Sequence, residues 1–254
     1  MEYEKTTFEG KEVEIHRNFH PDGSLNSEWT QTTYELHGYQ RKFYPSGKLK
    51  EEQFYRDGRK TAHDVSFYEN GNKKTETVLL NKDEFKKSSY FENGQIKNEI
   101  VTNAEGKTLY YNKSWYQNGQ LASTHQYTSL GEPTGKFFHY FEDGKIQIEG
   151  EYINGEANYI NVFLTPTNQT IIQGEGILHT NFGGRLANLK SECKVSKGVR
   201  NGVAKTYKDG VLKSEVFYVA GKAEGKSIEY TPEGLIDQFV YFENGIFTKR
   251  EKVN

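Results

Sequence analysis

The sequence contains few of the residues from which most protein interiors are built. Only 34% of its 254 residues are hydrophobic, and it has one cysteine, Cys193, one methionine and five prolines. A single cysteine excludes an internal disulfide framework and a cysteine-rich zinc site. No run of residues is long and apolar enough for a transmembrane helix. The fold must therefore be stabilised by something other than disulfides, structural zinc or a large aliphatic core.

The chain also lacks a large excess of charge of either sign. The chain has 33 Lys and Arg residues against 35 Asp and Glu residues, which gives a net charge of −2. This balance provides no general attraction to nucleic acid, so we expect no nucleic-acid partner. The first residues, MEYEKTTFEGKEVEIHRNF, lack the apolar core of a signal peptide, and we expect a cytoplasmic chain. A chain from which a signal peptide had been removed would look the same.

Aromatic residues, in contrast, are abundant. They make up 14% of the chain, with 18 Tyr, 16 Phe and 2 Trp. Disordered chains are poor in aromatics, so this composition predicts a folded protein. Burying half of each ring surface would contribute about 90 kcal/mol in gross terms, which is the order of the hydrophobic term of a whole domain. We therefore expect aromatic rings to replace a conventional aliphatic core as the packing material.

Short turn sequences that end in glycine recur with a period of about 24 residues. Aligned on that glycine, seven of nine copies carry an aromatic residue four positions earlier, and eight carry an aliphatic residue two positions later. Six copies carry a glutamate five positions later: Glu28, Glu52, Glu76, Glu99, Glu149 and Glu215. The predicted structural turn glycines are Gly23, Gly47, Gly71, Gly94, Gly119, Gly144, Gly210 and Gly234, and a further copy is FGG at 182–184.

A second turn follows the first after 11 to 12 residues in most copies. Many of these turns contain Asn-Gly or Asp-Gly, which accept the positive φ of tight hairpins. The runs between turns alternate, as in KIQIEGEY, and none shows the 3.6-residue stripe of a helix. The pattern predicts an all-β fold, an elongated, twisted, single-layer antiparallel β-meander of about 18–22 short strands.

The repeats predict one continuous solenoid domain with three stretches. Residues 1–156 form a regular array of about six repeats with an amino-terminal cap, residues 157–200 are degenerate repeats, and residues 201–254 are regular repeats with a carboxy-terminal cap. The degenerate stretch is either an atypical unit that bends the rod or a specialised contact region, and we favour the first. Lys249, Arg250 and Lys252 would blunt an open sheet edge.

The repeated pattern resembles the bacterial variant of the MORN repeat. The clearest copies are FYPSGKLKEEQFYRDGR (43–59), YFEDGKIQIEGEYINGE (140–156) and YKDGVLKSEVFYVAGKAEGKSIEY (207–230), and Gly135, Gly202 and Gly225 match the glycine that opens the next strand. Bacterial proteins made only of such repeats resemble the YwqK-type antitoxin or immunity family. The resemblance implies a MORN-like repeat solenoid and a protein that neutralises a partner toxin.

The sequence does not favour catalysis, a metal site or a cofactor. The seven histidines show no HxH or HExxH spacing, and no P-loop or GxSxG is present. Cys193 and His179 are conceivable as a nucleophile and base, but a packed thiol is the more common role of a free cysteine. Because the glutamates repeat strictly, we expect them to contact Lys or Arg side chains, Tyr hydroxyls or backbone N–H groups in neighbouring strands instead of forming an active site.

A long surface that mixes aromatic and charged residues is typical of protein-binding surfaces. The residues that we expect to contact a partner are Tyr44, Tyr68, Phe91, Tyr116 and Phe141, each three positions before a turn glycine. The predicted function is a non-enzymatic antitoxin or immunity protein that binds one cognate toxin and occludes it. The alternative is a MORN scaffold that bridges proteins or associates with membrane lipid, and a more distant one is a carbohydrate-binding module that uses stacked aromatics.

Overall fold

A computed structural model describes residues 2–181 and 188–253, and the predicted turn at 182–184 lies outside these residues. The chain divides into two units, Met1–Gly131 and Glu132–Asn254. The strands of the first unit are β1 (Glu2–Phe8), β2 (Lys11–Phe19), β3 (Leu25–Gln31), β4 (Leu36–Phe43), β5 (Leu49–Arg56), β6 (Arg59–Phe67), β7 (Lys73–Asn81), β8 (Glu84–Tyr90), β9 (Ile96–Asn103), β10 (Thr108–Trp115) and β11 (Leu121–Tyr127). Those of the second unit are β12 (Pro133–Tyr140), β13 (Ile146–Ile153), β14 (Glu156–Thr165), β15 (Asn168–Ile172), β16 (Glu175–Asn181), β17 (Leu189–Ser196), β18 (Val199–Lys208), β19 (Val211–Val219), β20 (Lys222–Ala223), β21 (Gly225–Tyr230), β22 (Ile236–Glu243) and β23 (Ile246–Lys252).

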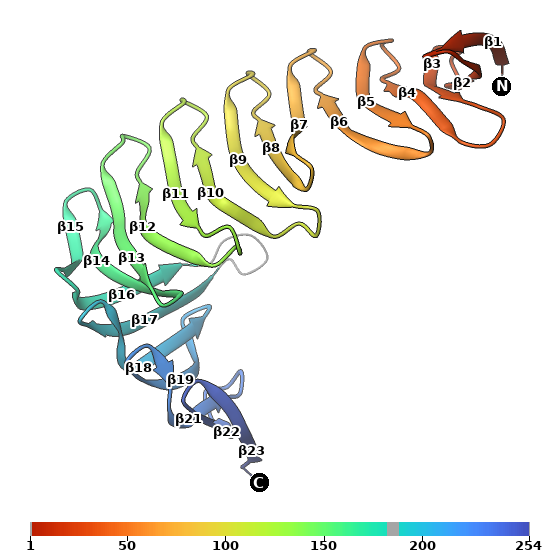
Figure 1. Cartoon of the computed structure of the whole chain (residues 1–254). Helices are drawn as coiled ribbons and strands as arrows, with labels where there is room; N and C mark the ends of the chain where they lie inside the picture. Colours follow the sequence, from red (N-terminus) through yellow and green to blue (C-terminus); the bar gives the residue numbers. More distant parts are fainter. Residues whose placement is uncertain (1, 182–187, 254) are drawn as a thin grey trace. The chain divides into compact units, whose positions relative to one another are not determined.

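Within each unit, strands that follow one another in the sequence pair antiparallel, from β1–β2 to β10–β11 and from β12–β13 to β22–β23, except that β20 and β21 both pair with β19. Figure 1 shows each unit as a series of hairpins in sequence order. The predicted all-β antiparallel meander is confirmed. The described residues hold 23 strands, one more than the upper expectation, because an irregularity separates the two-residue β20 from β21.

Five-residue turns close one set of hairpins. At 44–48 the Tyr44 amide donates to the Lys48 carbonyl oxygen at 2.9 Å, and the Gly47 amide donates to the Tyr44 carbonyl oxygen at 2.8 Å. Gly47 has a φ of +78°, a conformation that favours glycine, so this is a type I turn followed by a left-handed residue. The same pair of backbone bonds occurs in the turns that contain Gly23, Gly71, Gly94, Gly119, Gly144 and Gly234.

Two-residue turns close the other set. In Asp57–Gly58 both residues have positive φ, +52° and +70°, and the flanking residues of β5 and β6 pair directly. This is the conformation of a type I′ hairpin. Gly210 belongs to this set rather than to the five-residue set in which the sequence spacing places it. Its neighbour Asp209 also has a positive φ, and Lys208 pairs directly with Val211.

Bulges recur near the start of the second strand in several hairpins. The register is interrupted around Gly38 in β4 and around Gly202 in β18, and these glycines have φ of +117° and +109°. The bulge in β10 contains a tyrosine instead, Tyr110, which adopts a φ of +59°. Its side chain is 41% exposed, and its hydroxyl donates to the Glu84 carboxylate at 2.6 Å. A bulky side chain in this backbone conformation is strained.

The buried positions are mainly aliphatic, so the expectation that rings replace an aliphatic core is wrong for them. The buried hydrophobic residues are Val13, Val65, Val101, Leu109, Phe137, Val162, Ile171, Leu178, Cys193, Val195 and Val240. Phe137 is the one aromatic in this set from the described residues. A short branched side chain in mid-strand is covered completely by its cross-strand neighbours, whereas a ring in a single layer extends beyond them. Most rings are accordingly half-buried.

The stretch predicted as degenerate holds a buried aliphatic cluster. Val162, Ile171, Leu178 and Val195, one from each of β14 to β17, pack together in the second unit. The Gly198 turn between β17 and β18 also reaches β14, because its carbonyl oxygen accepts a hydrogen bond from the Tyr159 amide at 2.7 Å. In this stretch, strands that are not neighbours in the sequence are therefore brought together.

We predict that Tyr110→Gly stabilises the protein by about 0.5–1 kcal/mol, because glycine relieves the left-handed strain and the exposed hydroxyl bond to Glu84 contributes little. Tyr111→Gly is the matched control. Tyr111 is half-buried and its hydroxyl donates to Glu99, so this change should lower stability. Urea unfolding measures both, and a loss of stability in Tyr110→Gly comparable to that of the control would show that Tyr110 is not strained.

Candidate functional site

Four of the five predicted contact residues lie in the first unit, where each starts a five-residue turn. Tyr44, Tyr68, Phe91 and Tyr116 all make the same pair of backbone bonds described for Gly47, and their side chains are half-buried. Phe141 occupies the same place in a turn of the second unit and is also half-buried. All five residues therefore share one local geometry.

The two tyrosines at the start of this series connect consecutive repeats. The Tyr44 hydroxyl donates to the Phe67 carbonyl oxygen at 2.8 Å, and the Tyr68 hydroxyl donates to the Tyr90 carbonyl oxygen at 2.9 Å. Lysine ammonium groups lie over the rings at 5.5 to 5.7 Å from their centroids, on Tyr44, Tyr68 and Phe91, and these lysines are Lys50, Lys74 and Lys97. These rings are part of the framework of the turns, and they present lysines beside them to solvent.

The repeated glutamates form ion pairs and hydrogen bonds with neighbouring strands, as the sequence predicts. Arg41 Nε of β4 donates to the Glu52 carboxylate of β5 at 2.7 Å, and the Tyr90 hydroxyl of β8 donates to the Glu76 carboxylate of β7 at 3.2 Å. The hydrogen bond from Lys73, on the same strand as Glu76, lowers the pKa of Glu76. Burial, followed by the hydrogen bond to Glu99, raises the pKa of Tyr111 to about 12. Each carboxylate thus stabilises the packing of adjacent strands.

The structure separates the one conceivable nucleophile from its base. Cys193 is directly opposite Leu178 and His179 is directly opposite Glu192, so the cysteine and the histidine lie on opposite faces of the sheet. Burial raises the pKa of the Cys193 thiol, which donates to the Lys194 carbonyl oxygen at 3.3 Å. No group of three or more metal-ligating side chains in residues 2–181 and 188–253 is placed to hold an ion.

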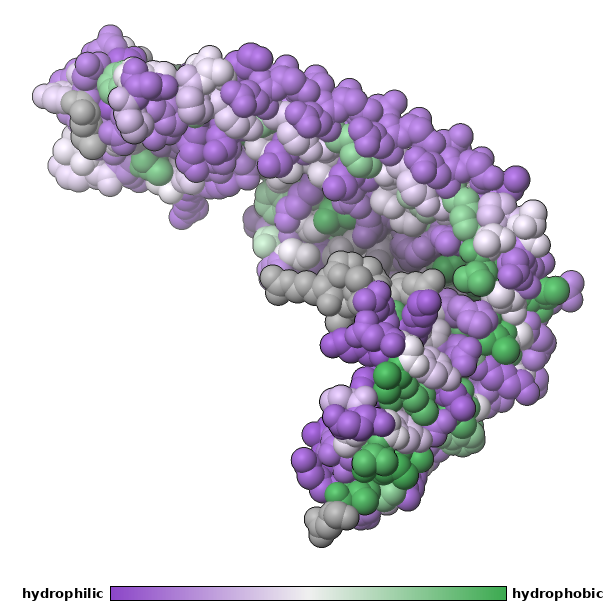
Figure 2. Space-filling model, turned by 180° about the vertical axis from the view of Figure 1, so that it is seen from behind, coloured by the Kyte–Doolittle hydropathy of each residue, from purple (hydrophilic) through white to green (hydrophobic). Residues whose placement is uncertain are grey.

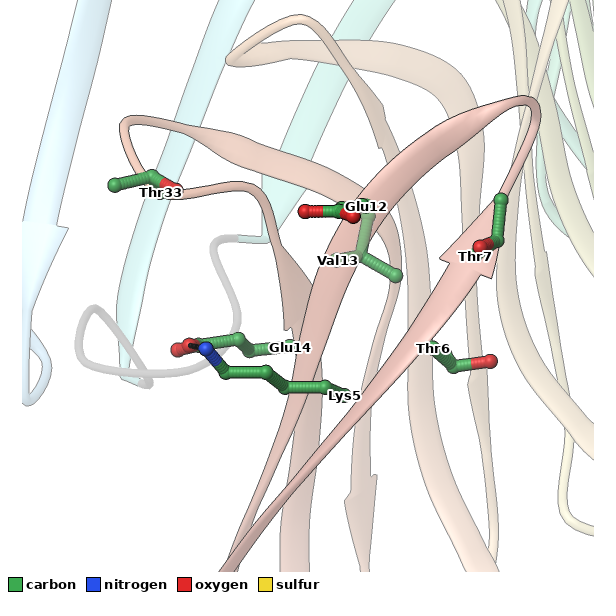
Figure 3. Close-up of a pocket in the computed structure, with 7 residues that line it drawn as sticks. All are labelled: Lys5, Thr6, Thr7, Glu12, Val13, Glu14 and Thr33. Carbon is green, nitrogen blue, oxygen red and sulfur yellow. Dashed lines mark ion pairs between the residues drawn. The ribbon is translucent and has the colours of Figure 1, made fainter.

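A small cavity lies between the β1–β2 hairpin and the β3–β4 connection (Figure 3). It has a volume of about 280 Å³, and its lining residues include the threonines Thr6, Thr7 and Thr33. Lys5 and Glu14, on paired strands, form an ion pair of 3.6 Å at its edge. Its lining holds no histidine, cysteine or serine; its polar groups are the three threonine hydroxyls, Lys5, Glu12 and Glu14.

A group of exposed apolar side chains lies on one face of the second unit. We define the apolar strip as Ile177, Val203, Phe217 and Val219, whose side chains are 42–47% exposed. Val203 and Phe217 are directly opposite one another on β18 and β19, and Val219 follows Phe217 on the same face. Figure 2 shows hydrophobic residues gathered over the carboxy-terminal strands. Exposed apolar side chains in contact with one another are typical of interaction sites.

Lysines border the apolar strip. Lys194 lies directly opposite Ile177, and Lys205 lies on β18 two residues after Val203. Ile177, Lys194, Val203 and Lys205 also line a shallow cavity of about 440 Å³. The surface therefore combines an apolar centre with a polar rim, the arrangement found in protein interfaces.

Sequence reasoning missed the apolar strip because both faces of β19 carry apolar residues. In the run EVFYV, Val216 and Tyr218 alternate with Phe217 and Val219, so hydrophobic alternation does not distinguish the two faces. The bulge at Gly202 determines the face on which Val203 lies. This bulge arises from the pairing of β17 with β18, which the sequence of one strand does not show.

A family model described as the MORN repeat variant matches residues 36–57 and 133–154. These ranges correspond to the β4–β5 hairpin of the first unit and the β12–β13 hairpin of the second. MORN repeats are non-catalytic in general and mediate protein or lipid interactions. The matches therefore indicate a protein-binding repeat protein. The sequence matches no curated protein.

The similar solved structures are distant. The crystal structures of TcdB2-TccC3-TEV and TcdB2-TccC3-Cdc42 are 10% and 9% identical, with TM-scores of 0.22 and 0.18 over 88% and 92% of this chain. This chain spans only 15% and 17% of those chains. A porin-like protein from Bacteroides uniformis is 9% identical with a TM-score of 0.15, over 98% of this chain and 91% of the other. These values are too low to bear on fold or function. Within the described ranges, no helix has the length and hydropathy to span a membrane.

We predict that Cys193 reacts slowly with iodoacetamide at pH 8 in the native protein, because the thiolate is the reactive form and burial disfavours it. Unfolding in guanidinium should accelerate the reaction by about tenfold or more. Mass spectrometry of timed, quenched samples measures both rates. A native rate equal to the unfolded rate would identify an activated thiol and contradict a purely packed role.

Proposed function

We propose that this chain is an antitoxin or immunity protein that neutralises a cognate bacterial toxin by stoichiometric binding and occlusion in the cytoplasm. The apolar strip carries the protein-binding part of this proposal, because Val203 and Phe217 expose apolar surface that a partner would remove from water. The resemblance of the repeats to the YwqK-type family supports the antitoxin part. Inhibition by occlusion requires a rigid complementary surface and no reactive group.

One lysine of each basic dipeptide is neutralised, which reduces the positive charge available to an anionic membrane. Lys60, Lys73 and Lys86 each belong to a basic dipeptide, and each forms an ion pair, with Asp64, Glu76 and Glu99 respectively. Lipid binding by basic clusters depends on cations that are available to the lipid headgroups. Neutralised lysines on the sheet contribute little to such binding.

The predicted contact column of turn aromatics remains a second proposed surface. Tyr44, Tyr68 and Phe91 are fixed by the turns, and Lys50, Lys74 and Lys97 lie over their rings. A toxin that contacts this column would meet a row of cations on aromatic supports, and we expect its contacting surface to be acidic.

We predict that Val203→Asp weakens binding to the cognate toxin by about tenfold or more, because it places a charge at the centre of the apolar strip. Val78→Asp is the matched control: Val78 is a valine of the first unit with similar exposure, 40% against 46% for Val203. The measurement is co-expression with the product of the adjacent gene, which the proposal requires to be toxic, scored by growth rescue and by a one-to-one complex in size-exclusion chromatography.

Absence of both rescue and complex with the wild-type chain would contradict the antitoxin function. Pelleting of the chain with anionic liposomes would favour the membrane adaptor instead. If Val203→Asp binds like the wild type while Lys74→Glu loses binding, the contact surface is the turn column and the apolar strip is not involved.

A further inference from the structure

A ladder of stacked rings crosses the first three strands of the first unit. Tyr3, His16 and Trp29 are directly opposite one another on β1, β2 and β3. The Tyr3 and His16 ring centroids are 5.8 Å apart with an angle of 24° between the planes, and those of His16 and Trp29 are 5.2 Å apart with an angle of 10°. The ring planes therefore face along the direction from strand to strand, and one face of Trp29 points toward β4.

The ladder has no ring at its next position. Gln40 on β4 is directly opposite Trp29, and its side-chain amide donates to the Thr30 carbonyl oxygen at 3.0 Å. This bond holds the Gln40 side chain close to the backbone. Gln53 on β5 is the following residue in the same row. A cavity of about 360 Å³ lies here, and we call it the Trp29 groove; its lining includes Ser27, Trp29, Gln40, Lys42, Glu51 and Gln53.

The strand spacing sets the width of the Trp29 groove. Trp29 and Gln53 are two strands apart, and two strand spacings amount to about 9–10 Å. A ring held above Gln40 would thus lie about 5 Å from both the Trp29 indole and the Gln53 side chain, which is a stacking distance. The cavity volume is also in the range of small-ligand sites. The groove fits one ring on the face of Trp29.

The hydrogen-bonding groups of the groove favour a ligand with donors. Gln40 donates to Thr30 and Gln53 donates to the Asp64 carboxylate at 3.3 Å. Within the described part of the chain, the Oε1 atoms of both glutamines accept no hydrogen bond. These acceptors are available to hydroxyl groups at the edge of a bound ring. A purely apolar ring would leave them unsatisfied.

The charges of the groove favour a neutral ligand. Lys42 is paired with Glu51 at 2.8 Å, and the other charged lining residues, Glu28 and Arg41, are paired with Arg17 at 2.9 Å and Glu52 at 2.7 Å. A guanidinium would find no unpaired carboxylate among them, and a phosphate would find no unpaired cation. A sugar ring has an apolar face that stacks on indole and hydroxyl donors at its edge.

We propose that the Trp29 groove binds a neutral pyranose ring, stacked on Trp29 with its hydroxyls donating to Gln40 and Gln53. This site is independent of the proposed toxin binding, because it lies on β3 to β5 and the apolar strip lies in the second unit. A neutral carbohydrate is then a second class of ligand for this chain.

Isothermal titration calorimetry with cellobiose, maltose and diacetylchitobiose tests the proposal in the absence of any toxin. We expect at least one of these sugars to bind saturably with a Kd of about 1 mM, and Trp29→Ala to weaken this binding by about tenfold or more. Trp115→Phe is the control for the other tryptophan and should bind like the wild type. Gln53→Ala keeps the stacking ring and should weaken binding by about three- to tenfold, which tests the site if Trp29→Ala does not fold by circular dichroism.

Three results would overturn the proposal. The first is no saturable binding of any of the three sugars by the folded wild type. The second is sugar binding that Trp29→Ala and Gln53→Ala leave unchanged. The third is tighter binding of arginine amide or glucose 6-phosphate than of the neutral sugars, because the groove would then select for charge.

Discussion

The positive φ of glycine at the hairpin turns is the constraint on which the rest of this structure depends. At Gly47 the left-handed residue completes a five-residue turn, and at Asp57–Gly58 two such residues complete a two-residue turn. Five-residue turns fix the register of the β2–β3 and β4–β5 pairs, residues 32–35 connect β3 to β4, and the resulting register aligns Arg17, Glu28, Arg41 and Glu52 in one cross-strand row. A slip of one residue would move each of these side chains to the opposite face and break every ion pair of the row.

Because strands pair mainly with their neighbours in the sequence, few side chains are fully buried, and this limits where a functional site can form. Each unit has a single layer, so a side chain is covered mainly by its cross-strand neighbours, and valines such as Val65 and Val101 are buried while most rings are not. Cys193 and His179, the nucleophile and base considered from the sequence, lie on opposite faces of the sheet. The binding that we propose uses exposed faces of the sheet, through apolar contact at the apolar strip and ring stacking at Trp29. Both surfaces are formed by strands, which hold their side chains in fixed positions.

Features that depend on a single hairpin could be predicted from the sequence. The turn glycines, the antiparallel order and the ion pairs of the glutamates follow from spacing and local turn chemistry. Features that depend on contacts between hairpins were not predictable. The aliphatic cluster around Ile171 and Val195 arises where β14 to β17 pack together, and the repeat period is lost there. The sequence did not indicate Trp29 as a binding residue, because the groove beside it depends on the hydrogen bond from the Gln40 side chain to the Thr30 carbonyl oxygen.

Amide hydrogen exchange measured by mass spectrometry tests the central claim most directly, because it reports the protection of each strand without reference to any partner. The account predicts protection in the turn-linked strand pairs, weakest in the exposed β23, with the slowest exchange in β14 to β17, where the buried aliphatic cluster adds to local pairing. Uniformly fast exchange in these strands, equal to that of the exposed β23, would contradict it. Equal protection across several hairpins, with no change at the glycine turns, would also contradict it. In that case a globular core, and not the local register of each hairpin, would stabilise the chain.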